Sequence, residues 1–281
     1  MFATKENIDE IVKLLPCKTK GKYKGFSIIL FCGTGGDYSE WDNFDLKSFY
    51  NKIKKHWCNG AKYESKFKGI LNFQTKLSRI TQTFSFTPLE YLLTNNFENK
   101  TKYSEIYPNE YFFDKKQIKD SLIKLLNFHD IKGPYLFIGF SEGGYRILDL
   151  QSRMKNVLGC ILIDPERFSL LSPEHISMFQ YIDSFTTKEN KLELLWKQIS
   201  YYKWYNFVSK FKLNIKVPVI CYMNVENFEN DYTQRFLSEN EFVDKMNNKT
   251  EFKIFFDEIH ALHLIHFDEI IEDVKLLSKN I

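Results

Sequence analysis

Short apolar runs that end at glycine or at a polar residue constrain the fold of this chain more than any other feature. The strongest run covers residues 25–32, reads GFSIILFC and ends at CGTGGD. A continuous apolar run of this length is typical of a strand that is buried on both faces of a sheet. Four later runs have the same character: YLFI at 135–138, LGCILI at 158–163, VPVICYM at 217–223 and FKIFF at 252–256.

Helical patterns lie between these expected strands. Residues 116–128 place apolar side chains at 118, 122, 123, 125 and 126, which form one stripe along a helix. Residues 143–154 and 267–277 are also expected to be helices. Buried strands that alternate with helices predict an α/β fold, with a mostly parallel central sheet and helices on both faces. In such a sheet, ligands bind beyond the C-terminal ends of the strands.

The length of 281 residues predicts a single domain over residues 1–281 with a core of its own. Residues 166–213 interrupt the alternation and contain LELLWKQISYYKWYNFVSKF, which is helical in pattern and rich in aromatic residues. This insertion is expected to form a helical cap over the sheet edge, or else an ordinary packed pair of helices. Residues 60–112 show weak periodicity, and the basic run at 18–24 is expected to be a solvated lead into the first strand.

Composition excludes several classes of protein. The 39 basic and 36 acidic residues nearly balance, which argues against nucleic-acid binding. No apolar run approaches the ~20 residues of a membrane helix, and the N-terminal residues lack the apolar core of a signal peptide. Five cysteines without a CxxC pair favour free thiols in a reducing compartment, so a cytoplasmic location is expected.

The sequence GFSEGG, which follows the expected strand at 135–138, is the sharpest chemical feature. It matches G-x-S-x-G between a strand and a helix, the context in which a serine is raised above the sheet as a nucleophile. Glycines two residues on either side of Ser141 remove side chains that would clash in so tight a turn. The N-terminus of the following helix offers backbone N–H groups to an oxyanion.

With these residues, the chain resembles the α/β-hydrolase family over most of its length. FCGTGGDYSEW is similar to the strand end that forms the family's oxyanion loop, with Cys32-Gly33 where the family usually has His-Gly. The resemblance implies that the backbone N–H groups of Thr34 and Glu142 bind the oxyanion. It also implies a triad acid after the strand at 217–223, either Glu226 or Asp231, with Asp164 as the alternative at the end of the previous strand.

The triad base is expected near the C-terminus, since the family's chain order is serine, acid, histidine. Three histidines cluster in HALHLIHFDEIIEDV. His263 is the favoured base because Asp268 follows it by five residues, a spacing typical of the family. His260 is the alternative because it lies nearer the strand, and His266 is expected to begin the last helix. Spacing of i, i+3, i+6 spreads the three around a helix, and the acid of HExxH is missing, so no metal site is expected.

These features predict a serine hydrolase that cleaves an ester or thioester through an acyl-enzyme on Ser141, without a cofactor. The aromatic residues of the expected cap favour a small-molecule substrate with an apolar acyl group. Two alternatives stay open. One is a non-catalytic binding protein with this fold, and the other is an acyltransferase that uses the same triad.

Overall fold

The computed structural model describes residues 12–13, 15–33, 38–45, 70–87, 115–165, 214–225, 246, 249–256 and 261–279. Its regular elements follow the chain in this order: β1 (Cys17–Lys20), β2 (Ser27–Phe31), η1 (Tyr38–Trp41), β3 (Asp42–Asp45), β4 (Ile70–Asn72), α3 (Phe73–Leu77), β5 (Gln82–Phe86), α5 (Lys115–Phe128), β6 (Tyr135–Phe140), α6 (Glu142–Arg153), β7 (Val157–Ile163), β8 (Val219–Val225), β9 (Thr250–Phe256), η5 (Leu262–Leu264) and α10 (Phe267–Leu277).

Seven strands form one sheet in the order β1-β5-β2-β6-β7-β8-β9, and β3 pairs with β4 in a separate ribbon. All neighbours in the large sheet are parallel except β1, which runs antiparallel to β5. The five strands and three helices expected from the sequence are all present, with ends that differ from the expected ones by at most two residues. The predicted fold class, a mostly parallel sheet with helices on both faces, is therefore confirmed.

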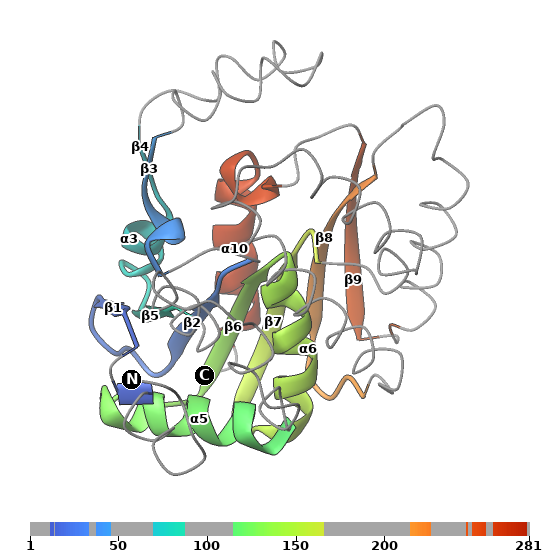
Figure 1. Cartoon of the computed structure of the whole chain (residues 1–281). Helices are drawn as coiled ribbons and strands as arrows, with labels where there is room; N and C mark the ends of the chain where they lie inside the picture. Colours follow the sequence, from blue (N-terminus) through green and yellow to red (C-terminus); the bar gives the residue numbers. More distant parts are fainter. Residues whose placement is uncertain are drawn as a thin grey trace, which may run out of the picture.

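Alternation along each strand divides the apolar residues between two faces. In β2, Ile29 and Phe31 join a core cluster with α5 and α6, whereas Ile28 and Leu30 join a second cluster with α3, η5 and α10. Figure 1 shows α6 in front of the sheet and α10 on its far side. Every β2 residue is buried, and full burial of one such side chain stabilises the fold by roughly 1.5–3 kcal/mol.

The sequence did not indicate β5, which lies inside the sheet between β1 and β2. Its residues Thr83 and Ser85 are completely buried, so the strand lacks the apolar pattern of its neighbours. Their hydroxyl groups are satisfied internally, because Thr83 donates to the Lys20 carbonyl and Ser85 donates to the Tyr38 carbonyl. Long-range hydrogen bonds of this kind leave no trace in a local sequence pattern.

The basic run at 18–24 was expected to be solvated, and this expectation is wrong for part of it. Lys18 and Lys20 belong to β1, and both form ion pairs with the buried Asp42. The sequence pattern did not indicate these ion pairs, because Asp42 follows the two lysines by more than twenty residues. Thr19 and residues 21–24 of the run are exposed, as expected.

Four of the five cysteines are described, and all four are free thiols, whereas Cys58 lies outside the described residues. Burial raises the pKa of Cys160 well above its usual range, because the thiolate would lose its hydration. In the described part of the chain, no helix has the length and apolar character needed to cross a membrane. The expected cap at 166–213 lies outside the described residues, so the domain assignment stays a prediction.

Candidate active site

Ser141 occupies the turn between β6 and α6, at the C-terminal edge of the parallel sheet. Its backbone is left-handed, with φ 52° and ψ −121°, which is rare for a residue with a side chain. Its N–H donates to the Ile163 carbonyl at 3.0 Å, which extends the pairing of β6 with β7 by one residue. Strained backbone of this kind persists only where the surroundings enforce it, and it is concentrated at functional sites.

The two glycines of the motif allow the chain to pack closely around this turn. A Cβ atom on Gly139 would lie 2.6 Å from the Gly143 carbonyl, and one on Gly143 would lie 2.3 Å from the Phe31 carbonyl. Both distances are shorter than any van der Waals contact that a Cβ atom makes in a folded protein. The start of α6 therefore lies directly against the end of β2, where the expected oxyanion loop begins.

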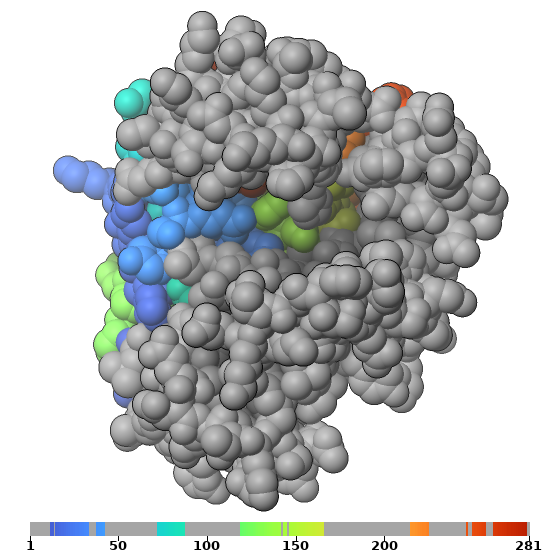
Figure 2. All heavy atoms as spheres, turned by 45° about the horizontal axis from the view of Figure 1, so that its top comes forward, coloured from blue at the N-terminus to red at the C-terminus, as the bar shows by residue number. Residues whose placement is uncertain are grey.

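Gly33, the first residue of that loop, lies next to Ser141. A Cβ atom on Gly33 would be 3.1 Å from the Ser141 Cβ. The Gly33 N–H donates to Glu40 Oε2 at 3.2 Å, so a carboxylate that the sequence did not indicate lies near the site. In Figure 2, which views the molecule from this edge, the blue segment near residue 40 lies beside green atoms of the β6–α6 region.

His263 is buried in η5, between β9 and α10, and is 2% exposed. Its imidazole packs against Phe140, the residue before Ser141, with ring centroids 4.9 Å apart. Trp41 and Phe73 complete the aromatic surroundings at 5.3 and 6.0 Å. The structure thus brings the expected base next to the strand end that carries the expected nucleophile.

Of the other residues predicted near His263, Asp268 and His266 lie within the described residues. Asp268 lies in the first turn of α10, as its spacing from His263 suggested. His266 directly precedes α10, as expected, packs on Phe255 with centroids 3.8 Å apart and pairs with Glu269 at 3.1 Å. His260 lies outside the described residues.

Of the three acid candidates, only Asp164 is described. It is 5% exposed, has a left-handed backbone with φ 40°, and follows β7, the neighbour of β6. Its Oδ1 accepts the Asn224 N–H at 3.0 Å, so the carboxylate bridges the C-terminal ends of β7 and β8. Glu226 follows β8 directly in the sequence, but both Glu226 and Asp231 lie outside the described residues.

Of the two expected oxyanion donors, Glu142 lies within the described residues and Thr34 does not. Glu142 is the first residue of α6, so its backbone lies at a helix N-terminus, where N–H groups are oriented toward an anion. Thr34 lies outside the described residues, although Gly33 immediately before it is placed beside Ser141. In the described residues, no three His, Cys, Asp or Glu side chains gather as metal ligands would.

Sequence reasoning missed the aromatic residues around His263. Trp41 and Phe73 are completely buried and pack on each other with centroids 5.4 Å apart. They come from η1 and α3, which lie more than thirty residues apart in the sequence. No local spacing signals such a contact; the one local signal is a tryptophan shortly after the glycine-rich loop.

No protein-family model and no curated protein matches this sequence. Solved structures match its fold at low identity. An esterase from Thermogutta terrifontis, with malate bound, is 11% identical, with a TM-score of 0.54 over 95% of this chain and 93% of that chain.

Two further solved structures that match this fold belong to a lipase and to a ring-cleaving protein. A monoacylglycerol lipase from Paleococcus ferrophilus is 12% identical, with a TM-score of 0.50 over 94% of this chain and 98% of that chain. A variant of AqdC, bound to the Pseudomonas quinolone signal whose ring it cleaves, is 11% identical, with a TM-score of 0.52 over 94% and 96%. Such different activities on one fold mean that the fold alone does not identify the reaction. The chain has the α/β-hydrolase fold.

Proposed function

We propose that this protein is a serine hydrolase that cleaves carboxylester or thioester bonds through an acyl-enzyme on Ser141. The observation that carries the proposal is the left-handed backbone of Ser141 at the β6–α6 turn, together with His263 packed on the adjacent Phe140. The esterase and lipase among the matched structures are in accord with ester hydrolysis as the reaction class.

In the proposed mechanism, Ser141 Oγ attacks the carbonyl carbon while His263 accepts the hydroxyl proton. The backbone N–H groups of Glu142 and Thr34 bind the oxyanion of the tetrahedral intermediate, and one such donor contributes about 3 kcal/mol in well-studied sites. His263 then returns the proton to the leaving alcohol or thiol. Water attacks the acyl-enzyme by the reverse steps, which releases the acid and restores Ser141.

The third member of the triad holds the imidazole in one tautomer and stabilises its cation. We propose Glu226 or Asp231 for this role and keep Asp164 as the alternative. Three amide variants distinguish these candidates: Glu226→Gln, Asp231→Asn and Asp164→Asn. The variant that removes the acid is expected to lower kcat by about 10⁴-fold, while the other two stay within about tenfold of the wild type. Equal, small losses in all three variants would contradict a triad.

We further propose a small-molecule substrate with an apolar acyl group and a cytoplasmic location. The aromatic-rich sequence at 166–213 supports the first proposal, and the free thiols of the described cysteines support the second.

Hydrolysis of p-nitrophenyl esters with increasing acyl length, and of one acyl thioester, tests the proposed function. Ser141→Ala is expected to abolish turnover. Ser152→Ala is the matched control, because Ser152 belongs to the far end of α6 and its hydroxyl donates to the Asp149 carbonyl within the same helix. Turnover that survives in Ser141→Ala, or no turnover by folded wild type, would contradict the proposal. A new ester formed on addition of an alcohol acceptor would indicate an acyltransferase instead.

A further inference from the structure

The imidazole of His263 is held by packing against three aromatic rings. Phe140 lies at the end of β6, in the middle of the large sheet, so its position is fixed by its pairing with Ile163 of β7. Trp41 and Phe73 lie outside that sheet, in η1 and α3. Their positions must therefore be fixed in another way.

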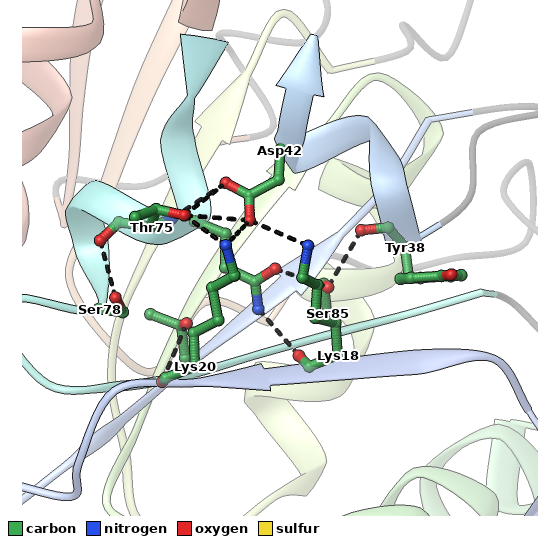
Figure 3. A network of polar contacts seen from close by, with 9 residues as sticks. Lys18, Lys20, Tyr38, Asp42, Thr75, Ser78 and Ser85 are labelled. Carbon is green, nitrogen blue, oxygen red and sulfur yellow. Dashed lines mark hydrogen bonds and ion pairs between the residues drawn. The ribbon is translucent and has the colours of Figure 1, made fainter. Parts of the chain in front are cut away.

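Asp42, the residue after Trp41, connects these outer elements to the sheet. Figure 3 shows its carboxylate between Lys18 and Lys20 of β1 and Thr75 of α3. The carboxylate is completely buried and accepts the Thr75 N–H at 3.1 Å and the Thr75 hydroxyl at 3.1 Å. Lys20 pairs closely with the same carboxylate, and Lys18 lies at 3.3 Å.

The charge of Asp42 is maintained by these partners. Burial alone would raise the pKa of Asp42, but the hydrogen bonds from Lys20 and Thr75 and the charge of Lys20 lower it below its usual value. A buried carboxylate that is paired and hydrogen-bonded on several sides fixes its neighbours firmly, because any movement would leave a charge uncompensated.

Trp41, the residue before Asp42, is held in place through this anchor. Within the described residues, the buried Nε1–H of Trp41 finds no acceptor. Phe73 lies two residues before Thr75 in the short helix α3 and is likewise tied to Asp42. Additional contacts hold the two segments to the sheet, since the Ser85 hydroxyl donates to the Tyr38 carbonyl and also lies 3.1 Å from Gln74 Oε1.

We propose that Asp42 is a positioning residue that holds Trp41 and Phe73 in place and thereby fixes the orientation of the His263 imidazole. The inference rests on the proposed function only for the role of His263 as the base. Asp42 does not touch the reacting atoms. Its removal is expected to reduce reactivity because a small misplacement of a base relative to its nucleophile can slow a reaction by about 100-fold.

The test compares Asp42→Asn with Asp149→Asn in the full chain. Asp149 is a matched control because it is also a buried carboxylate, paired with Arg153, but lies in α6 on the opposite face of the sheet. Two readouts are used: the rate of Ser141 labelling by a fluorophosphonate, and the ¹⁵N-edited NMR signals of the His263 imidazole, assigned with His263→Gln. Thermal unfolding of each variant separates loss of structure from loss of position.

Both variants are expected to lower the thermal midpoint. Only Asp42→Asn is expected to shift the His263 signals and to slow labelling by about 10- to 100-fold. Labelling of Asp42→Asn at the rate of Asp149→Asn, with unchanged His263 signals, would overturn the inference. If wild type labels with neither the fluorophosphonate nor a smaller sulfonyl fluoride, the proposed function fails, and the NMR comparison alone still decides whether Asp42 positions His263.

A second pair of variants keeps the test decisive if Asp42→Asn does not fold. Trp41→Phe retains an aromatic ring against His263 and is expected to label within about threefold of wild type. Trp41→Leu removes that ring and is expected to slow labelling as Asp42→Asn would. Wild-type labelling and unchanged His263 signals in Trp41→Leu would contradict the inference.

Discussion

Gly143 determines how closely the proposed nucleophile can approach the end of β2. A methyl group at this position would meet the Phe31 and Cys32 carbonyl oxygens at 2.3 and 2.7 Å. Both obstacles are backbone atoms in a buried strand end, so they cannot rotate away as a side chain would. The turn must therefore move away from β2, and the Ser141 hydroxyl must move with it.

We expect Gly143→Ala to lower the free energy of unfolding by about 1–3 kcal/mol, the usual range for overpacking. We also expect it to slow Ser141 labelling by more than tenfold. Gly159→Ala makes the same change inside β7, where the nearest atom is 3.1 Å away. Chemical denaturation of both variants measures the free energy of unfolding, and reaction with the fluorophosphonate measures the labelling rate. Normal labelling by Gly143→Ala would mean that the turn does not depend on the close contact.

Elements β8, β9 and α10 are joined by a second buried polar cluster, on the side of the sheet that carries His263. The Tyr222 hydroxyl donates a short hydrogen bond to Asp273, and Lys253 Nζ lies 2.8 Å from the same carboxylate. Burial, followed by the hydrogen bond and charge of Asp273, raises the pKa of Tyr222 far above its usual value. The raised pKa favours the protonated hydroxyl, which donates to Asp273.

We expect Tyr222→Phe to lower the free energy of unfolding by about 1.5–3 kcal/mol, because it removes a hydrogen bond to a buried charge. Tyr135→Phe is the control, since the Tyr135 hydroxyl donates at 3.2 Å to the neutral carbonyl of Ile131. Its cost is expected to be about 1 kcal/mol or less. Urea unfolding of both variants provides the comparison, and equal costs would show that Asp273 is satisfied without Tyr222.

Across the whole molecule, the sequence predicted the elements whose residues are uniformly apolar or regularly amphipathic. It identified β2, β6, β7, β8 and β9 and the three long helices, and it placed Ser141 on the turn that the structure shows. It missed β5, because Thr83 and Ser85 are buried through hydrogen bonds to distant residues. It missed Asp42 for the same reason, since its partners belong to β1 and α3.

The acid stability of the whole chain should reflect Asp42. Because the pKa of this carboxyl group is lowered in the folded protein, its ionised form stabilises the fold above its unfolded pKa of about 3.9. The stabilisation is lost as the pH falls through the folded pKa. The difference in unfolding free energy between wild type and Asp42→Asn is therefore expected to be constant above about pH 5 and to shrink below about pH 4. A difference that stays constant down to pH 2.5 would contradict this assignment.

Peptide mass spectrometry after reaction with a fluorophosphonate tests most directly whether Ser141 is an activated nucleophile. We expect one phosphonate adduct per chain, on the peptide that contains Ser141, and none in Ser141→Ala or in heat-unfolded protein. An adduct on any other residue, or no adduct on folded wild type with either this probe or a smaller sulfonyl fluoride, would contradict Ser141 as an activated nucleophile.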